Sequence, residues 1–173
     1  MAVAATAIVW SALAAQLVTR VGVKPVLVAG MTALSAGLLY FTQVSVDGSY
    51  IADLLPGFLL ISVGIGFSFV PISIAALAGV EASEAGLASG LINTSQQIGG
   101  ALGIAALTSI ATSTTSANVA DGASVPSALT DGFQSAFYGA AGVAVLGVLV
   151  SLLFVRGRDL TDAVAAEPAF EPA

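Results

Sequence analysis

The sequence contains no cysteine and no histidine, and only four of its 173 residues are lysine or arginine. The absence of cysteine excludes disulfides and thiol nucleophiles, and the absence of histidine removes the most common general base and metal ligand. We therefore expect no enzyme activity, no bound metal and no cofactor. The net charge of -6 also disfavours a nucleic-acid partner, because such proteins need a basic patch.

Charged residues of both signs are scarce, at 8% of the chain, whereas hydrophobic residues make up 57% and the mean hydropathy is +1.02. A soluble domain needs more polar surface than this composition provides. The apolar segments are continuous runs, which are typical of membrane-spanning helices and not of the alternating strands of a membrane barrel. The sequence thus predicts an all-α integral membrane protein in a lipid bilayer.

Five apolar segments are long enough, or nearly so, to cross a hydrocarbon core that takes about 20 helical residues. They predict transmembrane helices over about 1–19, 26–42, 54–77, 88–112 and 133–155, within a transmembrane region of residues 1–158. The polar stretch Thr112–Asp131 predicts a long loop between the last two helices. Residues 159–173 are acidic and contain proline, and they are predicted to form a disordered cytoplasmic tail. The short lead into the first helix indicates a truncated or split protein.

The basic residues predict the orientation of the chain in the cell membrane. All four lie at the ends of predicted helices, namely Arg20, Lys24, Arg156 and Arg158. Because successive helices cross the membrane in alternate directions, these ends fall on the same side. Loops rich in lysine and arginine stay in the cytoplasm, so this side is cytoplasmic. We therefore expect an N-terminus outside the cell and a C-terminus inside it.

The stretch Ala88–Ser113 has no charge, yet it carries amide side chains near its middle. At about 100° per residue, small and amide residues fall on one side of this helix, and Leu91, Ile98 and Leu102 fall on the other. The first side consists of Gly86, Ser89, Gly90, Asn93, Gln96, Gln97 and Gly100. Glycines let another helix approach closely, and amides in hydrocarbon need hydrogen-bond partners, worth about 0.6 to 2 kcal/mol each. The amides either hold helices together or line a polar cavity through which a solute passes.

Small residues and one proline form a second set of candidates, for helix packing and hinge motion. In the third predicted helix, Pro71 removes a backbone donor and predicts a kink on the same face as Gly57, Gly64 and Ser68. That kink is either a hinge or a static bend. The full set of packing and hinge candidates is Gly64, Gly66, Pro71, Gly86, Gly90, Gly99, Gly100 and Gly103.

Acidic residues lie outside the predicted spans. Glu81 and Glu84 precede the fourth helix, where we expect them to cap its positive end. Because no Asp, Glu, Lys or Arg falls within the five spans, a titrating group for coupled transport has to come from other helices.

The stretch Leu17–Lys24 reads LVTRVGVK. It resembles the C-terminal-half copy of the cytoplasmic loop signature of the major facilitator superfamily, G-x-L-x-D-R-x-G-R/K, although Ala15 and Thr19 replace the first glycine and the aspartate. Gly86–Gly103, GLASGLINTSQQIGGALG, resembles the penultimate helix of the 14-helix drug:proton antiporter branch, with the pattern A-S-G-x-x-N-T-x-R/Q-Q-x-G-G-A-x-G. Gly64–Pro71 resembles the glycine-and-proline helix before it. The resemblance covers almost all of residues 1–158 and corresponds to the last five helices of such a transporter.

The resemblance implies part of the C-terminal half of a two-half fold that alternates access by rocking. The implied function is the C-terminal portion of a multidrug or small-solute efflux transporter, secondary active and proton-coupled when complete, which does not transport alone. Its implied partners are the remaining helices, protons and a small hydrophobic or cationic solute. The resemblance assigns the cavity or the contact between halves to Asn93, Thr94, Gln96 and Gln97, and a cytoplasmic loop gate to Arg20, Gly22 and Lys24.

An alternative function belongs to a different class. The chain would then be a non-transporting membrane module that forms a homo-oligomer or packs against other membrane proteins through its glycine-rich helices.

Overall fold

The computed structural model describes residues 2–46, 48–77, 79–81 and 83–155. The helices are α1 (Ala2–Val21), α2 (Val23–Phe41), α3 (Leu55–Leu77), α4 (Ala85–Ala120) and α5 (Val125–Phe154), and a π-helical turn, η1 (Tyr50–Leu54), leads into α3. No strand occurs among these residues. The predicted all-α fold is confirmed for the described part of the chain.

Four helical stretches are long and apolar enough to cross a membrane: Val23–Phe41, Tyr50–Leu77, Ala85–Ala120 and Val125–Phe154. The helix α1, which the sequence predicted as the first span, is not among them. Length and composition therefore support four spans, and the fifth stays a prediction.

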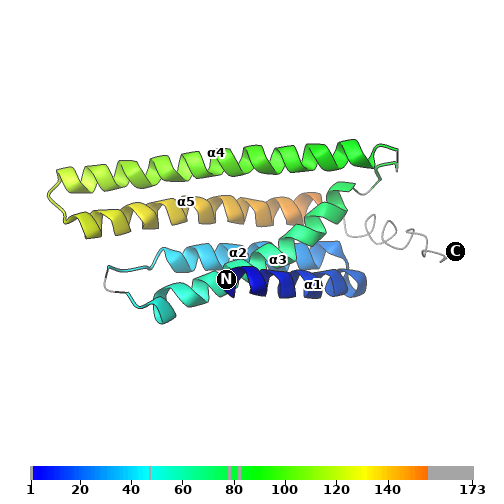
Figure 1. Cartoon of the computed structure of the whole chain (residues 1–173), viewed down its shortest axis with the longest axis horizontal. Helices are drawn as coiled ribbons and strands as arrows, with labels where there is room; N and C mark the ends of the chain where they lie inside the picture. The colour runs from blue at the N-terminus through cyan, green and yellow to red at the C-terminus, as the bar shows by residue number, and fades with distance from the viewer. Residues whose placement is uncertain (1, 47, 78, 82, 156–173) are drawn as a thin grey trace.

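The helices alternate in direction along the long axis of the molecule (Figure 1). The α2–α3 and α4–α5 connections lie at the left in that view, and the start of α2, the end of α3, the start of α4 and the end of α5 lie at the right. A hydrogen bond of 2.8 Å from Lys24 Nζ to the carbonyl oxygen of Leu152 ties the start of α2 to the end of α5. The helix ends that were predicted to be cytoplasmic thus share one end of the bundle.

Small residues allow α2 and α3 to pack closely. A methyl group built on Gly64 would lie 2.7 Å from the backbone nitrogen of Leu34, and one on Gly30 would lie 2.7 Å from the carbonyl carbon of Phe67. The buried residues of α3 are Gly57, Ser62, Gly64, Gly66, Ser68 and Pro71. The helix therefore turns its small residues inward, whereas large residues such as Phe69 remain exposed.

Aromatic contacts join the remaining helices to this pair. Trp10 of α1 packs edge-on against Phe67 of α3, with ring centroids 5.8 Å apart. Phe41 of α2 contacts Phe58 of α3 at 5.0 Å and Phe137 of α5 at 5.1 Å. These contacts bring α1, α2, α3 and α5 into one bundle.

The loop predicted over Thr112–Asp131 is wrong for most of its length. The helix α4 continues to Ala120 and α5 begins at Val125, so a helical hairpin replaces the loop. Hydroxyl groups that suggested a loop instead donate to carbonyls one turn back, as Thr112 does to Thr108 at 2.9 Å. Across the hairpin, Asn118 Nδ2 donates to Asp131 Oδ2 at 2.8 Å. The helices α2 and α4 also begin three residues earlier than predicted, at Val23 and Ala85 rather than at 26 and 88.

The start of α4 corrects a further expectation. Glu84 is the N-cap residue, but its side chain makes no capping hydrogen bond, and α4 has no acidic residue in its first turn.

Pro71 lies inside α3, which continues past it to Leu77. The predicted tail 159–173, together with Arg156 and Arg158, lies outside the described residues.

Candidate functional site

The amide-bearing half of α4 has few contacts with the rest of the fold. No residue of α4 is buried, whereas α2, α3 and α5 each contain buried residues. A methyl group would meet no heavy atom within 4 Å at any of five glycines of α4, namely Gly86, Gly90, Gly99, Gly100 and Gly103. These packing candidates thus have no neighbouring helix among the described residues. Gly64 faces α2, by contrast, and Gly66 faces Trp10 of α1.

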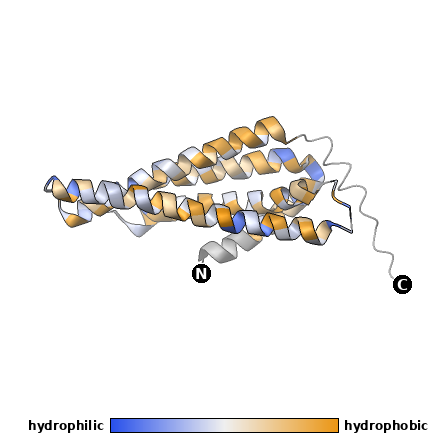
Figure 2. Ribbon diagram, turned by 90° about the horizontal axis from the view of Figure 1, so that it is seen from above, coloured by the Kyte–Doolittle hydropathy of each residue, from blue (hydrophilic) through white to orange (hydrophobic). Residues whose placement is uncertain are grey.

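The amide side chains of α4 are equally open. Asn93, Gln96 and Gln97 are exposed, and their amide groups make no hydrogen bond within the part of the chain that the structure describes. Figure 2 shows a hydrophilic patch partway along α4, the helix nearest the viewer, beside strongly hydrophobic stretches. Thr94 differs, because its Oγ1 donates to the carbonyl oxygen of Gly90 at 2.8 Å. Its hydroxyl is therefore satisfied within the helix.

A groove of about 210 Å³ lies between the end of α3 and the start of α4. Its lining residues are Phe69, Ser73, Leu77, Ser89, Ile92, Asn93 and Gln96. The fold therefore brings Asn93 and Gln96 together at this groove and leaves Gln97 and Thr94 off it. Sequence analysis missed Ser73, although it lies one helical turn after Phe69 and so on the same face.

The chemistry of the groove follows from its lining. Each amide offers two N–H donors and one carbonyl acceptor, and Phe69, Leu77 and Ile92 supply an apolar wall. No charged side chain is among the lining residues, so the described groove has no group that exchanges a proton near neutral pH. It suits the neutral, hydrogen-bonding part of an amphipathic solute.

The three residues assigned to the cytoplasmic loop gate lie where α1 meets α2. Gly22 has a φ of 89°, a positive value that favours glycine, and its N–H donates to the carbonyl oxygen of Val18 at 2.9 Å at the end of α1. Lys24 reaches the end of α5 as described above. Arg20 is exposed in the last turn of α1. The structure thus brings Lys24 to the end of a second helix and leaves Arg20 on the surface.

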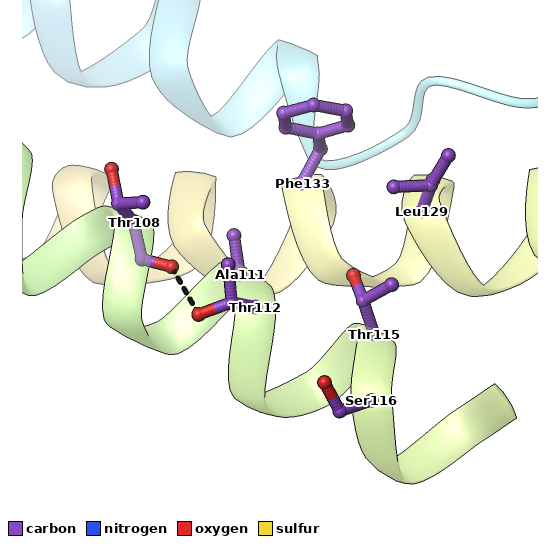
Figure 3. Close-up of a pocket in the computed structure, with 7 residues that line it drawn as sticks. All are labelled: Thr108, Ala111, Thr112, Thr115, Ser116, Leu129 and Phe133. Carbon is purple, nitrogen blue, oxygen red and sulfur yellow. Dashed lines mark hydrogen bonds between the residues drawn. The ribbon is translucent and has the colours of Figure 1, made fainter. Parts of the chain in front are cut away.

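A second pocket, of about 350 Å³, lies between α4 and α5 (Figure 3), and no motif in the sequence had pointed to it. It is lined by Thr108, Ala111, Thr112, Thr115, Ser116, Leu129 and Phe133. A neighbouring groove of about 250 Å³ shares Thr108, Ala111 and Phe133 and continues towards Leu38 of α2. The pocket could not be predicted because three of its four hydroxyl residues, Thr112, Thr115 and Ser116, fall in the stretch that was expected to be a loop.

Comparison with known proteins gives three informative relatives. The chain is 34% identical over 169 residues to the puromycin resistance protein pur8 of Streptomyces alboniger, covering 92% of this chain and 34% of that protein. It is 32% identical over 137 residues to the cephamycin export protein CmcT of Amycolatopsis lactamdurans, covering 79% and 26%. It is 36% identical over 107 residues to the multidrug resistance protein Stp of Mycobacterium tuberculosis, covering 62% and 19%. No family model and no solved structure matches the chain.

The chain spans about a third or less of the length of these curated relatives. They are resistance and export proteins and not enzymes, which agrees with the expectation from composition that the chain has no catalytic role.

Proposed function

We infer that this chain, which belongs to the drug-efflux transporters of the major facilitator superfamily, is the C-terminal portion of a multidrug or small-solute exporter. The complete protein belongs to the 14-helix branch and is a secondary active antiporter that exchanges the solute for protons. The chain supplies one wall of the solute pathway and does not transport alone. Its N-terminus lies outside the cell membrane, and its C-terminus lies in the cytoplasm.

The open face of α4 is the observation that carries this proposal. In a bilayer, amides without partners lose interactions worth about 0.6 to 2 kcal/mol each, and a glycine face without a neighbour gives up close helix packing. Helices from outside this chain would supply packing contacts at Gly90 and hydrogen-bond partners at Gln97. Since the relatives are about three times as long as the matched region or more, they contain enough further chain to do so.

The groove between α3 and α4 is the proposed solute wall. The relatives are named for puromycin, cephamycin and multiple drugs. The two amides and the apolar residues of the groove suit solutes of this kind. Small hydrophobic or cationic molecules are the proposed solutes, and the remaining helices would supply any countercharge. Those helices also supply the carboxylate for proton coupling, because Asp131 lies away from the groove, hydrogen-bonded to Asn118.

Efflux from cells tests the proposal. Cells that lack their own drug pumps would express the chain alone, the complementary helices of the transporter alone, or both together, with membrane levels matched by immunoblot. Ethidium, a hydrophobic fluorescent cation, reports efflux, and growth on puromycin reports resistance. We expect active efflux only when both parts are present.

Two results would count against the proposal. Efflux by the chain alone would show that it needs no other helices. A stable homo-oligomer that gives no efflux with the complementary helices, in either separate or fused form, would favour a non-transporting packing module instead.

A further inference from the structure

The pocket between α4 and α5 is a candidate binding site at the opposite end of α4 from the α3–α4 groove. Its volume of about 350 Å³ lies within the range of about 300 to 1,000 Å³ that is usual for small-molecule sites. Thr112 follows Asn93 by 19 residues on the same helix, a separation of about 28 Å at 1.5 Å per residue. A molecule in one site therefore leaves the other free.

Four hydroxyl groups of α4 form one wall of this pocket. Thr112 Oγ1 donates to the carbonyl oxygen of Thr108 at 2.9 Å, and Thr115 Oγ1 donates to that of Ala128 at 3.2 Å. A hydroxyl that donates still has lone pairs with which to accept. The hydroxyls of Thr108 and Ser116 donate to no described residue, so they remain available as donors. The wall can thus both donate to a ligand and accept from it.

Apolar side chains of α5 form the facing wall. Phe133 is 58% exposed and Leu129 is 44% exposed, and Figure 3 shows both on the α5 side of the pocket. An exposed ring beside hydroxyl groups gives a flat surface for stacking together with hydrogen-bonding partners. None of the described residues that line the pocket is charged, so a carboxylate or an ammonium ion finds no opposite charge there.

We propose that this pocket binds uncharged amphipathic molecules that carry both an aromatic ring and hydroxyl or amide groups. The ring stacks on Phe133, and the polar groups bond to the hydroxyls of Thr108 and Ser116. Binding itself depends only on this hairpin. A further role, as an outer station for a solute that leaves the transporter, rests on the proposed function.

Cysteine protection tests the site, and the absence of cysteine from the chain makes every introduced thiol unique. The full chain in lipid nanodiscs would carry Thr112→Cys, which places the thiol in the pocket. The matched control is Ser113→Cys, on the next residue, which is exposed but does not line the pocket. Chloramphenicol is the probe, because it is uncharged and has an aromatic ring, hydroxyls and an amide.

The rate of labelling by a water-soluble maleimide gives the result. At a probe concentration of about four times Kd, about four fifths of the sites are occupied, so labelling of the Thr112→Cys variant falls about fivefold. Labelling of the Ser113→Cys variant stays unchanged. Adding Phe133→Ala abolishes the protection, whereas Phe154→Ala, at the far end of α5 and also exposed, preserves it.

Unchanged labelling of the Thr112→Cys variant, or equal protection of both thiols, overturns the site. Protection that survives Phe133→Ala overturns it as well, since the ring is the proposed anchor. The outcomes separate this site from the proposed function. Protection together with failed efflux would support the binding site and contradict its role in transport. Efflux without protection would support the transporter and contradict the binding site.

Discussion

Replacing Gly64 with alanine is expected to destabilise the bundle, because the added methyl group has no room. It would lie 2.7 Å from the backbone nitrogen of Leu34 and 2.8 Å from its Cα, and backbone atoms cannot turn aside as a flexible side chain can. Overpacking of this kind costs about 1 to 3 kcal/mol, and alanine regains up to about 1 kcal/mol through its helix propensity. The free energy of unfolding should therefore fall by up to about 2 kcal/mol.

The same change at Gly90 is the matched control, on the open face of α4. A methyl group there meets no heavy atom within 4 Å, so only the gain in helix propensity remains. The free energy of unfolding of the chain should stay constant or rise by up to about 1 kcal/mol.

Both variants can be measured in the reconstituted chain by titration with sodium dodecyl sulfate, followed by circular dichroism. Equal losses from the two substitutions would refute the reasoning, because they would mean that α4 packs as tightly within this chain as α3 does. A larger fall in the free energy of unfolding from Gly90→Ala than from Gly64→Ala would mean that the face of α4 at Gly90 is closely packed and not open.

Three further predictions concern single side chains. In the complete transporter, Gln96→Leu should raise the solute concentration for half-maximal efflux about tenfold, the equivalent of one lost hydrogen bond, and Gln97→Leu should raise it less than about twofold. Ser68→Ala should leave the free energy of unfolding unchanged or raise it by up to about 1 kcal/mol, since its buried hydroxyl has no partner among the described atoms. Lys24→Met should speed amide hydrogen exchange in the last turn of α5, because it removes the tie to Leu152.

Matched variants control these predictions. Ser62→Ala removes a bond of 2.7 Å to the carbonyl oxygen of Phe58, so it should lower the free energy of unfolding by about 1 kcal/mol where Ser68→Ala does not. Arg20→Met removes a positive charge near the same end of the bundle without touching α5, so exchange there should not change. A stronger effect of Gln97→Leu than of Gln96→Leu on half-maximal efflux would contradict the assigned groove.

Hydropathy and residue size predicted much of this fold. Continuous apolar runs located the five helices, since a bilayer requires long stretches that satisfy their own backbone hydrogen bonds. The small-residue face of α3 was also predictable, because Gly57, Gly64, Ser68 and Pro71 repeat at helical spacing and only small residues allow two backbones to meet. Both are local properties of the chain.

Features that depend on distant contacts were not predictable. Serine and threonine in the stretch 112–120 indicated a loop, yet the hydroxyls of Thr112 and Thr115 bond to helical carbonyls. Asn118 gains a partner in Asp131 only once the hairpin has formed. The pocket beside Phe133 depends on that hairpin and was missed for the same reason. The glycines of α4 indicated that a helix packs there, but spacing alone cannot say that no described residue lies against them.

Quenching of tryptophan fluorescence by brominated lipids tests the central claim that helices from outside this chain cover the open face of α4. The probe is Gln97→Trp on that face, Leu91→Trp on the opposite face is the control, and Trp10→Phe removes the native tryptophan from both. The account predicts strong quenching of both probes in the chain alone. It predicts that the complementary helices relieve quenching at position 97 and not at position 91. Equal quenching at position 97 with and without those helices would contradict it.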